Sequence, residues 1–141
     1  DHAINYRTQD FVAEIARITD RRGVDIVLDM VGGDYIEKNL KSLALEGRLV
    51  IIAFLHGGRV EVDWRPIMMK RLTVTGSTLR ASLAERKAAI AVSLRENVWP
   101  LLESGEVKPV VHRVFPLAEA AAAHALMESS QHVGKIMLAV R

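Results

Sequence analysis

Three short segments carry groups that could shape a ligand site, and each follows an apolar run. They are Met30-Val31-Gly32, Phe54-Leu55-His56 and Ser77-Thr78-Leu79. Glycine lets a backbone approach a ligand without a clash at Cβ, imidazole can transfer a proton, and hydroxyl and backbone groups form hydrogen bonds. Open parallel sheets bind ligands at the carboxyl ends of their strands. The spacing therefore predicts that these segments lie at a ligand-binding edge.

Each segment also has a purely structural explanation. Gly32 suits a strand-to-helix turn whether or not a ligand approaches it. A lone loop histidine such as His56 is more often a surface residue than a general acid. The hydroxyls of Ser77 and Thr78 can cap the turn that follows them. Sequence alone leaves both explanations open for all three segments.

The sequence predicts no acid–base pair and no metal site. Asp29 and Asp34 are better explained as a carboxylate near a strand end and a helix cap than as a catalytic pair. The other histidines, at positions 2, 112, 124 and 132, are too scattered for a metal site, and no cysteine supplies a thiolate. We therefore expect no metal and assign no catalytic residue.

Short apolar runs predict strands, and helical periodicity fills the intervals between them. Ile26, Val27 and Leu28 should form a buried strand centre, and the uninterrupted run Leu49–Phe54 indicates a strand covered on both faces. Strands separated by helices predict a parallel sheet. The predicted strands are Ala3–Tyr6, Val24–Met30, Leu49–Phe54, Leu72–Thr75, Val110–Phe115 and Lys135–Val140.

The predicted helices have recognisable start signals. Thr8 is the expected N-cap of the first helix. Capping boxes are expected at Asp34–Glu37 and Ser82–Glu85. The second box opens a long helix, which should kink near Glu96–Asn97 because Pro100 lacks an amide hydrogen.

Longer motifs, taken together and in order, are more specific than any one of them. They are Gly23–Gly33, Gly47–Val50, Met69–Arg80, and the closing segments Leu117–Ala121 and Gly134–Leu138. In this order and spacing they resemble the zinc-independent quinone oxidoreductases of the medium-chain dehydrogenase/reductase superfamily. The resemblance spans essentially all 141 residues.

The resemblance implies an α/β fold with a partial doubly wound parallel sheet of the Rossmann type. The sheet would lack its first two strands and the glycine-rich phosphate loop, and Ala3–Tyr6 would be its third strand. Residues 1–105 would form the C-terminal part of the dinucleotide-binding domain. Residues 106–141 would return to the catalytic, GroES-like lobe. We therefore expect roughly the first half of the enzyme to lie outside this chain, so that the isolated chain forms no normal cofactor site and is inactive.

The resemblance also implies an NADPH site. Tyr6 would lie near the adenosine ribose and its 2′-phosphate, although it can also simply close a strand end. The segments Met30-Val31-Gly32 and Phe54-Leu55-His56 would face the ribose and nicotinamide. Backbone groups of Ser77-Thr78-Leu79 would hold the carboxamide. Lys135 would reach a cofactor phosphate, or would protect a sheet edge by its charge.

The implied function is hydride transfer from NADPH to a small-molecule quinone or other conjugated carbonyl. An enoyl-thioester reductase, which shares this half of the fold, is one alternative. A non-catalytic nucleotide-binding protein of the same fold is another. Family members often form homodimers by pairing their sixth strands, which predicts a homodimer through residues 72–77.

The composition bears on the partners and the location of the protein. The net charge is +2, charges are scattered, and aromatic residues make up 5% of the chain, which argues against a nucleic-acid partner. No apolar run approaches the roughly 20 residues that span a bilayer. The absence of cysteine fits a cytoplasmic protein.

Overall fold

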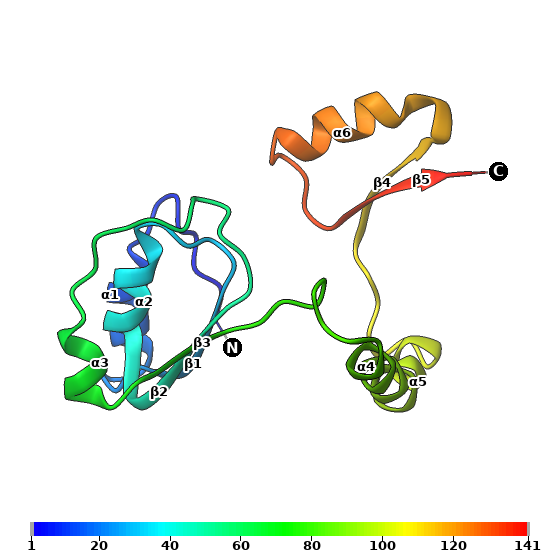
Figure 1. Ribbon diagram of the computed structural model, residues 1–141. Helices are drawn as coiled ribbons and strands as arrows, with labels where there is room; N and C mark the ends of the chain where they lie inside the picture. Colours follow the sequence, from blue (N-terminus) through cyan, green and yellow to red (C-terminus); the bar gives the residue numbers. More distant parts are fainter. Residues whose placement is uncertain (1, 141) are drawn as a thin grey trace. The chain divides into compact units, whose positions relative to one another are not determined.

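The computed structural model describes residues 2–140, which form two compact units, one up to Ser82 and the other from Leu83 (Figure 1). The first unit contains α1 (Phe11–Ile18), β1 (Val24–Asp29), α2 (Tyr35–Ser42), β2 (Leu43–Ile51), α3 (Arg65–Lys70) and β3 (Thr73–Gly76). The second contains α4 (Ala84–Asn97), α5 (Trp99–Glu103), β4 (Val111–Pro116), η1 (Leu117–Glu119), α6 (Ala120–Glu128) and β5 (Lys135–Ala139). The predicted domain boundary after residue 105 stays a prediction.

The first unit is built on a parallel sheet in the order β1-β2-β3. Leu49 at the centre pairs with Val27 on one side and Val74 on the other. The predicted α/β class and partial Rossmann-type fold are confirmed.

The core of this unit lies where α2 and α3 pack on the sheet. Leu40 of α2 and the β2 residues Leu43 and Leu49 are at most 1% exposed, and Leu72 completes the cluster. Burying each such side chain stabilises the fold by about 1.5–3 kcal/mol. The core therefore fixes the strands whose carboxyl ends carry the predicted site.

The opposite face of the sheet differs from the prediction. Ile26 and Leu28 are 66% and 64% exposed, and only Val27 of the expected buried centre packs against the core. Alternation along β1 places Ile26 and Leu28 on the face away from Val27. Ile52, just after β2, is 43% exposed, so the expectation of a strand covered on both faces is also wrong for residues 2–82.

The predicted strand Ala3–Tyr6 is also wrong. Residues 2–5 have no regular structure, and a turn starts at Tyr6. Here the Asn5 carbonyl accepts hydrogen bonds from the amides of Thr8 and Gln9, so the backbone bonds locally instead of to a neighbouring strand. Helix α1 is capped by Asp10, whose carboxylate accepts from Val12 N at 3.0 Å, and not by Thr8.

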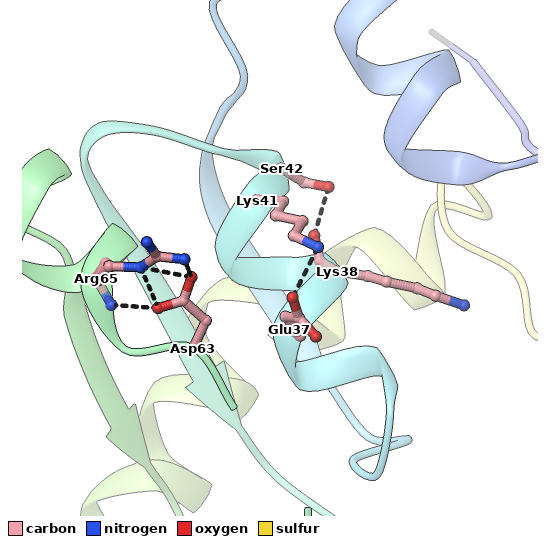
Figure 2. Close-up of polar contacts among 6 residues, drawn as sticks. All are labelled: Glu37, Lys38, Lys41, Ser42, Asp63 and Arg65. Carbon is pink, nitrogen blue, oxygen red and sulfur yellow. Dashed lines mark hydrogen bonds and ion pairs between the residues drawn. The ribbon is translucent and has the colours of Figure 1, made fainter. Parts of the chain in front are cut away.

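Neither capping box forms. At the start of α2, Glu37 instead contacts Lys41 at 2.7 Å, and Asp34 contacts Lys38 at 3.5 Å; the Glu37 pair is drawn in Figure 2. These ion pairs at i,i+4 spacing occupy carboxylates that a capping box would use. Before α4, the Ser82 hydroxyl donates to the Thr78 carbonyl at 2.9 Å instead of capping the helix.

The second unit follows its predicted pattern more closely. The long helix breaks at Val98 between α4 and α5, with Pro100 in the first turn of α5, which confirms the expected interruption. Strands β4 and β5 pair in parallel, with Val114 opposite Met137. Phe115 and Ala123 are 3% and 5% exposed and are the buried hydrophobic residues of this unit among residues 83–140.

Candidate functional site

The three predicted segments follow β1, β2 and β3 at one edge of the sheet. Because the strands are parallel, their carboxyl ends lie together. A cavity of about 560 Å³ is lined by the carboxyl ends of β2 and β3 and the residues that follow them, 51–54 and 74–78. This volume is within the range of small-molecule sites. Phe54, Ser77 and Thr78 are the predicted site residues that line the cavity.

The loops after β1 and β2 are hydrogen-bonded to each other. We call residues 30–33 the first loop and residues 54–58 the second loop. The bonds are Leu55 N to Met30 O at 3.2 Å, His56 N to Val31 O at 2.7 Å, and Gly33 N to Gly57 O at 2.9 Å. Their backbones extend the contact between β1 and β2 beyond the sheet, and this contact gives both loops a defined shape before any ligand binds.

Glycine is required where the two loops touch. Gly32 has φ +70°, and a Cβ there would lie 2.7 Å from Phe54 Cδ1 and 2.8 Å from Gly57 O. A side chain at this position would therefore suffer both backbone strain and a steric clash. The structural explanation for Gly32 is confirmed, and its contact with a ligand stays a prediction.

Asp29, at the last position of β1, bonds the first loop directly. Its carboxylate is buried, and the residue is 4% exposed. Oδ1 accepts from Val31 N at 2.7 Å, and both carboxylate oxygens lie 3.2 Å from Gly32 N. Sequence reasoning placed Asp29 near a strand end but missed this role. The available signal was an acidic residue closing an apolar strand and followed three positions later by glycine.

His56 packs against an aromatic side chain rather than joining a proton relay. Its ring meets Tyr35 edge-on, with 6.1 Å between centroids, and Tyr35 stacks on Phe11 at 5.5 Å. Within residues 2–140, no hydrogen-bond partner is found for the imidazole. The geometry thus supports a packing role for His56, because no neighbouring group in the described part of the chain is placed to exchange a proton with its imidazole.

The third segment, residues 77–79, is held less closely. Ser77 N donates to Ile51 O at 3.0 Å, which continues the β2–β3 ladder by one bond. Leu79 is 55% exposed. Among residues 2–140, no hydrogen bond joins this segment to the first or second loop. Its position therefore depends mainly on the end of β3.

The remaining predicted residues lie elsewhere. Tyr6 is 64% exposed in the turn before α1 and does not line the cavity. Lys135 begins β5 in the second unit, where its amide donates to Val110 O at 2.7 Å. Their cofactor contacts stay predictions.

The site has little formal charge and no metal-ligand cluster. In the part of the chain that the structure describes, no three His, Cys, Asp or Glu residues are grouped to hold a metal, and no helix is long and apolar enough to cross a membrane.

A marked pKa shift lies outside the site, on an exposed surface: hydrogen bonds from Arg65 lower the pKa of Asp63 to about 2 (Figure 2). Its ordinary value is 3.8.

Comparison with known proteins identifies relatives along nearly the whole chain. The sequence profile described as zinc-binding dehydrogenase matches residues 1–138. A highly reducing polyketide synthase from Gibberella zeae is 31% identical over 99% of this chain and 5% of its own length. Quinone oxidoreductase from Rattus norvegicus is 29% identical over 95% of this chain and 39% of the relative. For 2-haloacrylate reductase from Burkholderia sp the values are 33%, 97% and 41%.

Solved structures of dehydrogenases and reductases also match nearly the whole chain. An NAD-dependent alcohol dehydrogenase matches all of this chain and 38% of its own, with a TM-score of 0.75 and 31% identity. The CurK enoyl reductase matches 99% of this chain and 41% of its own, with a TM-score of 0.76 and 30% identity. The chain thus spans about 40% of the length of these structures and of the rat and Burkholderia relatives.

Proposed function

Because the chain belongs to the zinc-binding dehydrogenase family of the medium-chain dehydrogenase/reductase superfamily, we propose a reductase function for the full-length protein. The reaction is hydride transfer from NADPH, without zinc, to a quinone or other conjugated carbonyl. The observation that carries the proposal is the pair of hydrogen-bonded loops beside a cavity at the carboxyl ends of parallel strands. This is where open α/β sheets bind nucleotides.

The residues at this edge fit one half of a nicotinamide cofactor. Gly32 leaves the first loop without a side chain next to Phe54, and the cavity lined by the carboxyl ends of β2 and β3 can admit a flat ring. When bound, the cofactor supplies the hydride. The chain's own part is to orient it: Met30, Val31, Gly32, Phe54, Leu55 and His56 face the ribose and nicotinamide, and Ser77, Thr78 and Leu79 hold the carboxamide. Tyr6 and Lys135 contact the cofactor's phosphates.

The names of two relatives support the acceptor. Quinone oxidoreductase is named for a quinone, and 2-haloacrylate reductase for an acid with a conjugated double bond. The apolar walls at Ile52, Phe54 and Val74 suit the flat, conjugated part of such an acceptor.

Assembly and location are part of the same proposal. Every residue of β3 is exposed, and β3 is an edge strand of its sheet. A second copy pairing along residues 72–77 would satisfy that edge and make a homodimer. We also place the protein in the cytoplasm, on the absence of cysteine from the chain.

An enoyl-thioester reductase is the second candidate. The polyketide synthase and the CurK enoyl reductase match this chain at 31% and 30% identity, within a few per cent of the rat quinone oxidoreductase. The first and second loops would serve a quinone or an enoyl-thioester acceptor equally, because both reactions take hydride from the same cofactor. The acceptor must therefore be identified by assay.

The test is NADPH oxidation by the full-length protein, followed by the loss of nicotinamide absorbance. We expect turnover with 1,2- or 1,4-quinones, lower activity with NADH, and no effect of a zinc chelator. Turnover restricted to enoyl thioesters would replace the first candidate with the second. Tight NADPH binding with no turnover on either class would indicate a non-catalytic nucleotide-binding protein.

A further inference from the structure

We infer that Asp29 is a positioning residue, whose carboxylate holds the first and second loops in one shared arrangement. The inference rests on the proposed function for what these loops contact, but not for the coupling between them. Its basis is the buried carboxylate, which touches only the backbone amides of the first loop among its hydrogen-bond partners in residues 2–140.

Val31 and Asp29 connect the two chain segments, because each residue forms hydrogen bonds through two of its groups. Val31 donates its amide to Asp29 at 2.7 Å and accepts His56 N with its carbonyl at the same distance. The Asp29 carbonyl accepts Ile52 N at 2.8 Å, where the chain leads into the second loop. Asp29 therefore bonds the first loop with its side chain and, with its backbone, Ile52, two residues before the second loop.

The position calls for a carboxylate and not merely for a polar residue of that size. An ionised carboxylate only accepts hydrogen bonds, and here both its oxygens face amide donors. In Asp29→Asn, one oxygen becomes an NH₂ group. If the remaining oxygen keeps the short bond to Val31, this new donor faces the donor of Gly32. The variant keeps the volume but removes part of the anchor of the first loop.

A matched control exists on the same strand. Asp25 has a side chain that is 69% exposed, and it pairs with Arg22 at 2.6 Å. Asp25→Asn makes the same chemical change on β1 without touching either loop. Exposed ion pairs contribute little to stability, so this variant should behave as wild type in every measurement below.

The experiment measures amide hydrogen exchange and ligand binding in the full-length protein. In Asp29→Asn we expect amides of both loops to exchange about tenfold faster, while Leu49 in the core keeps its protection. NADPH should bind about tenfold more weakly, because ordering the loops now costs binding free energy. Adenosine 2′,5′-bisphosphate, which has no nicotinamide, should bind unchanged; a general structural role would weaken both ligands.

Unchanged exchange in the second loop would overturn the inference, as would equal acceleration in the loops and at Leu49. If the variant does not fold, the wild type alone decides: Val31, Gly32 and His56 should open together, with protection factors within about tenfold. A larger spread would also overturn the coupling. If the wild type binds no NADPH, the proposed function fails, while the exchange data still decide the role of Asp29.

Discussion

The strand ends of the first unit differ in how they are held. The first and second loops share three backbone hydrogen bonds and the close contact at Gly32, and the Asp29 carboxylate bonds the first loop. The third segment extends the sheet by one bond and then projects an exposed Leu79. One part of the proposed site is therefore shaped by the protein alone. The other part depends on the end of one edge strand.

The largest loss of stability is expected from a substitution in the core that supports both the two loops and the third segment. Leu49 is 0% exposed, and Leu49→Ala should lower the free energy of unfolding by about 2–5 kcal/mol, through lost burial and a residual cavity. Denaturant unfolding measures this change. The amides of the two loops and of the third segment should lose protection from hydrogen exchange together, because global unfolding exposes all of them. A loss below about 1 kcal/mol would contradict the proposed core.

Gly32→Ala tests the contact between the loops. We expect a loss of about 2–3 kcal/mol in unfolding free energy, since the new Cβ meets Phe54 and Gly57 and φ is +70°. NADPH affinity should fall with it. Gly57→Ala is the control: its φ is +90°, but nothing lies within 4 Å of the added Cβ. The control should cost only about 1 kcal/mol. Equal losses would mean that backbone strain, and not loop contact, explains the glycine.

Ser77→Ala probes the less constrained segment. Its unfolding free energy should change by less than about 0.5 kcal/mol, because the bond to Ile51 uses the amide and not the hydroxyl. NADPH affinity, measured by fluorescence titration, should stay within about threefold, since backbone groups are proposed to hold the carboxamide. A loss of more than about tenfold would assign that contact to the hydroxyl instead.

The smallest effect lies on the exposed surface before α3, away from both regions. Arg65 holds the pKa of Asp63 at about 2, below its ordinary 3.8, so the pair stabilises the fold above the ordinary pKa. That contribution is lost as the pH falls through the folded-state value. Thermal unfolding midpoints of wild type and Asp63→Asn should therefore differ slightly near neutral pH and converge towards pH 2. A constant difference across that range would contradict the pKa shift.

The sequence predicted what local pattern controls. Apolar runs located β1 and β3, but the predicted strand Leu49–Phe54 overlaps β2 only over Leu49–Ile51, since β2 begins at Leu43 and residues 52–54 lie outside the strand. The parallel order predicted the edge where the three segments meet. It did not predict what depends on contacts between elements: the bonds between the loops, or the inward carboxylate of Asp29. The exposure of Ile26 and Leu28 was missed for a similar reason, because an apolar pattern does not tell which face the helices cover.

Hydrogen exchange of the full-length protein with and without cofactor tests whether the three strand-end segments bind the nicotinamide half of the cofactor. NADPH should slow exchange in residues 30–33, 54–58 and 77–79, with the largest change in the third segment, because the protein alone orders it least. Adenosine 2′,5′-bisphosphate should protect none of the three. NADPH binding that leaves these segments unprotected, or equal protection by the nicotinamide-free ligand, would contradict the placement of the nicotinamide at these segments.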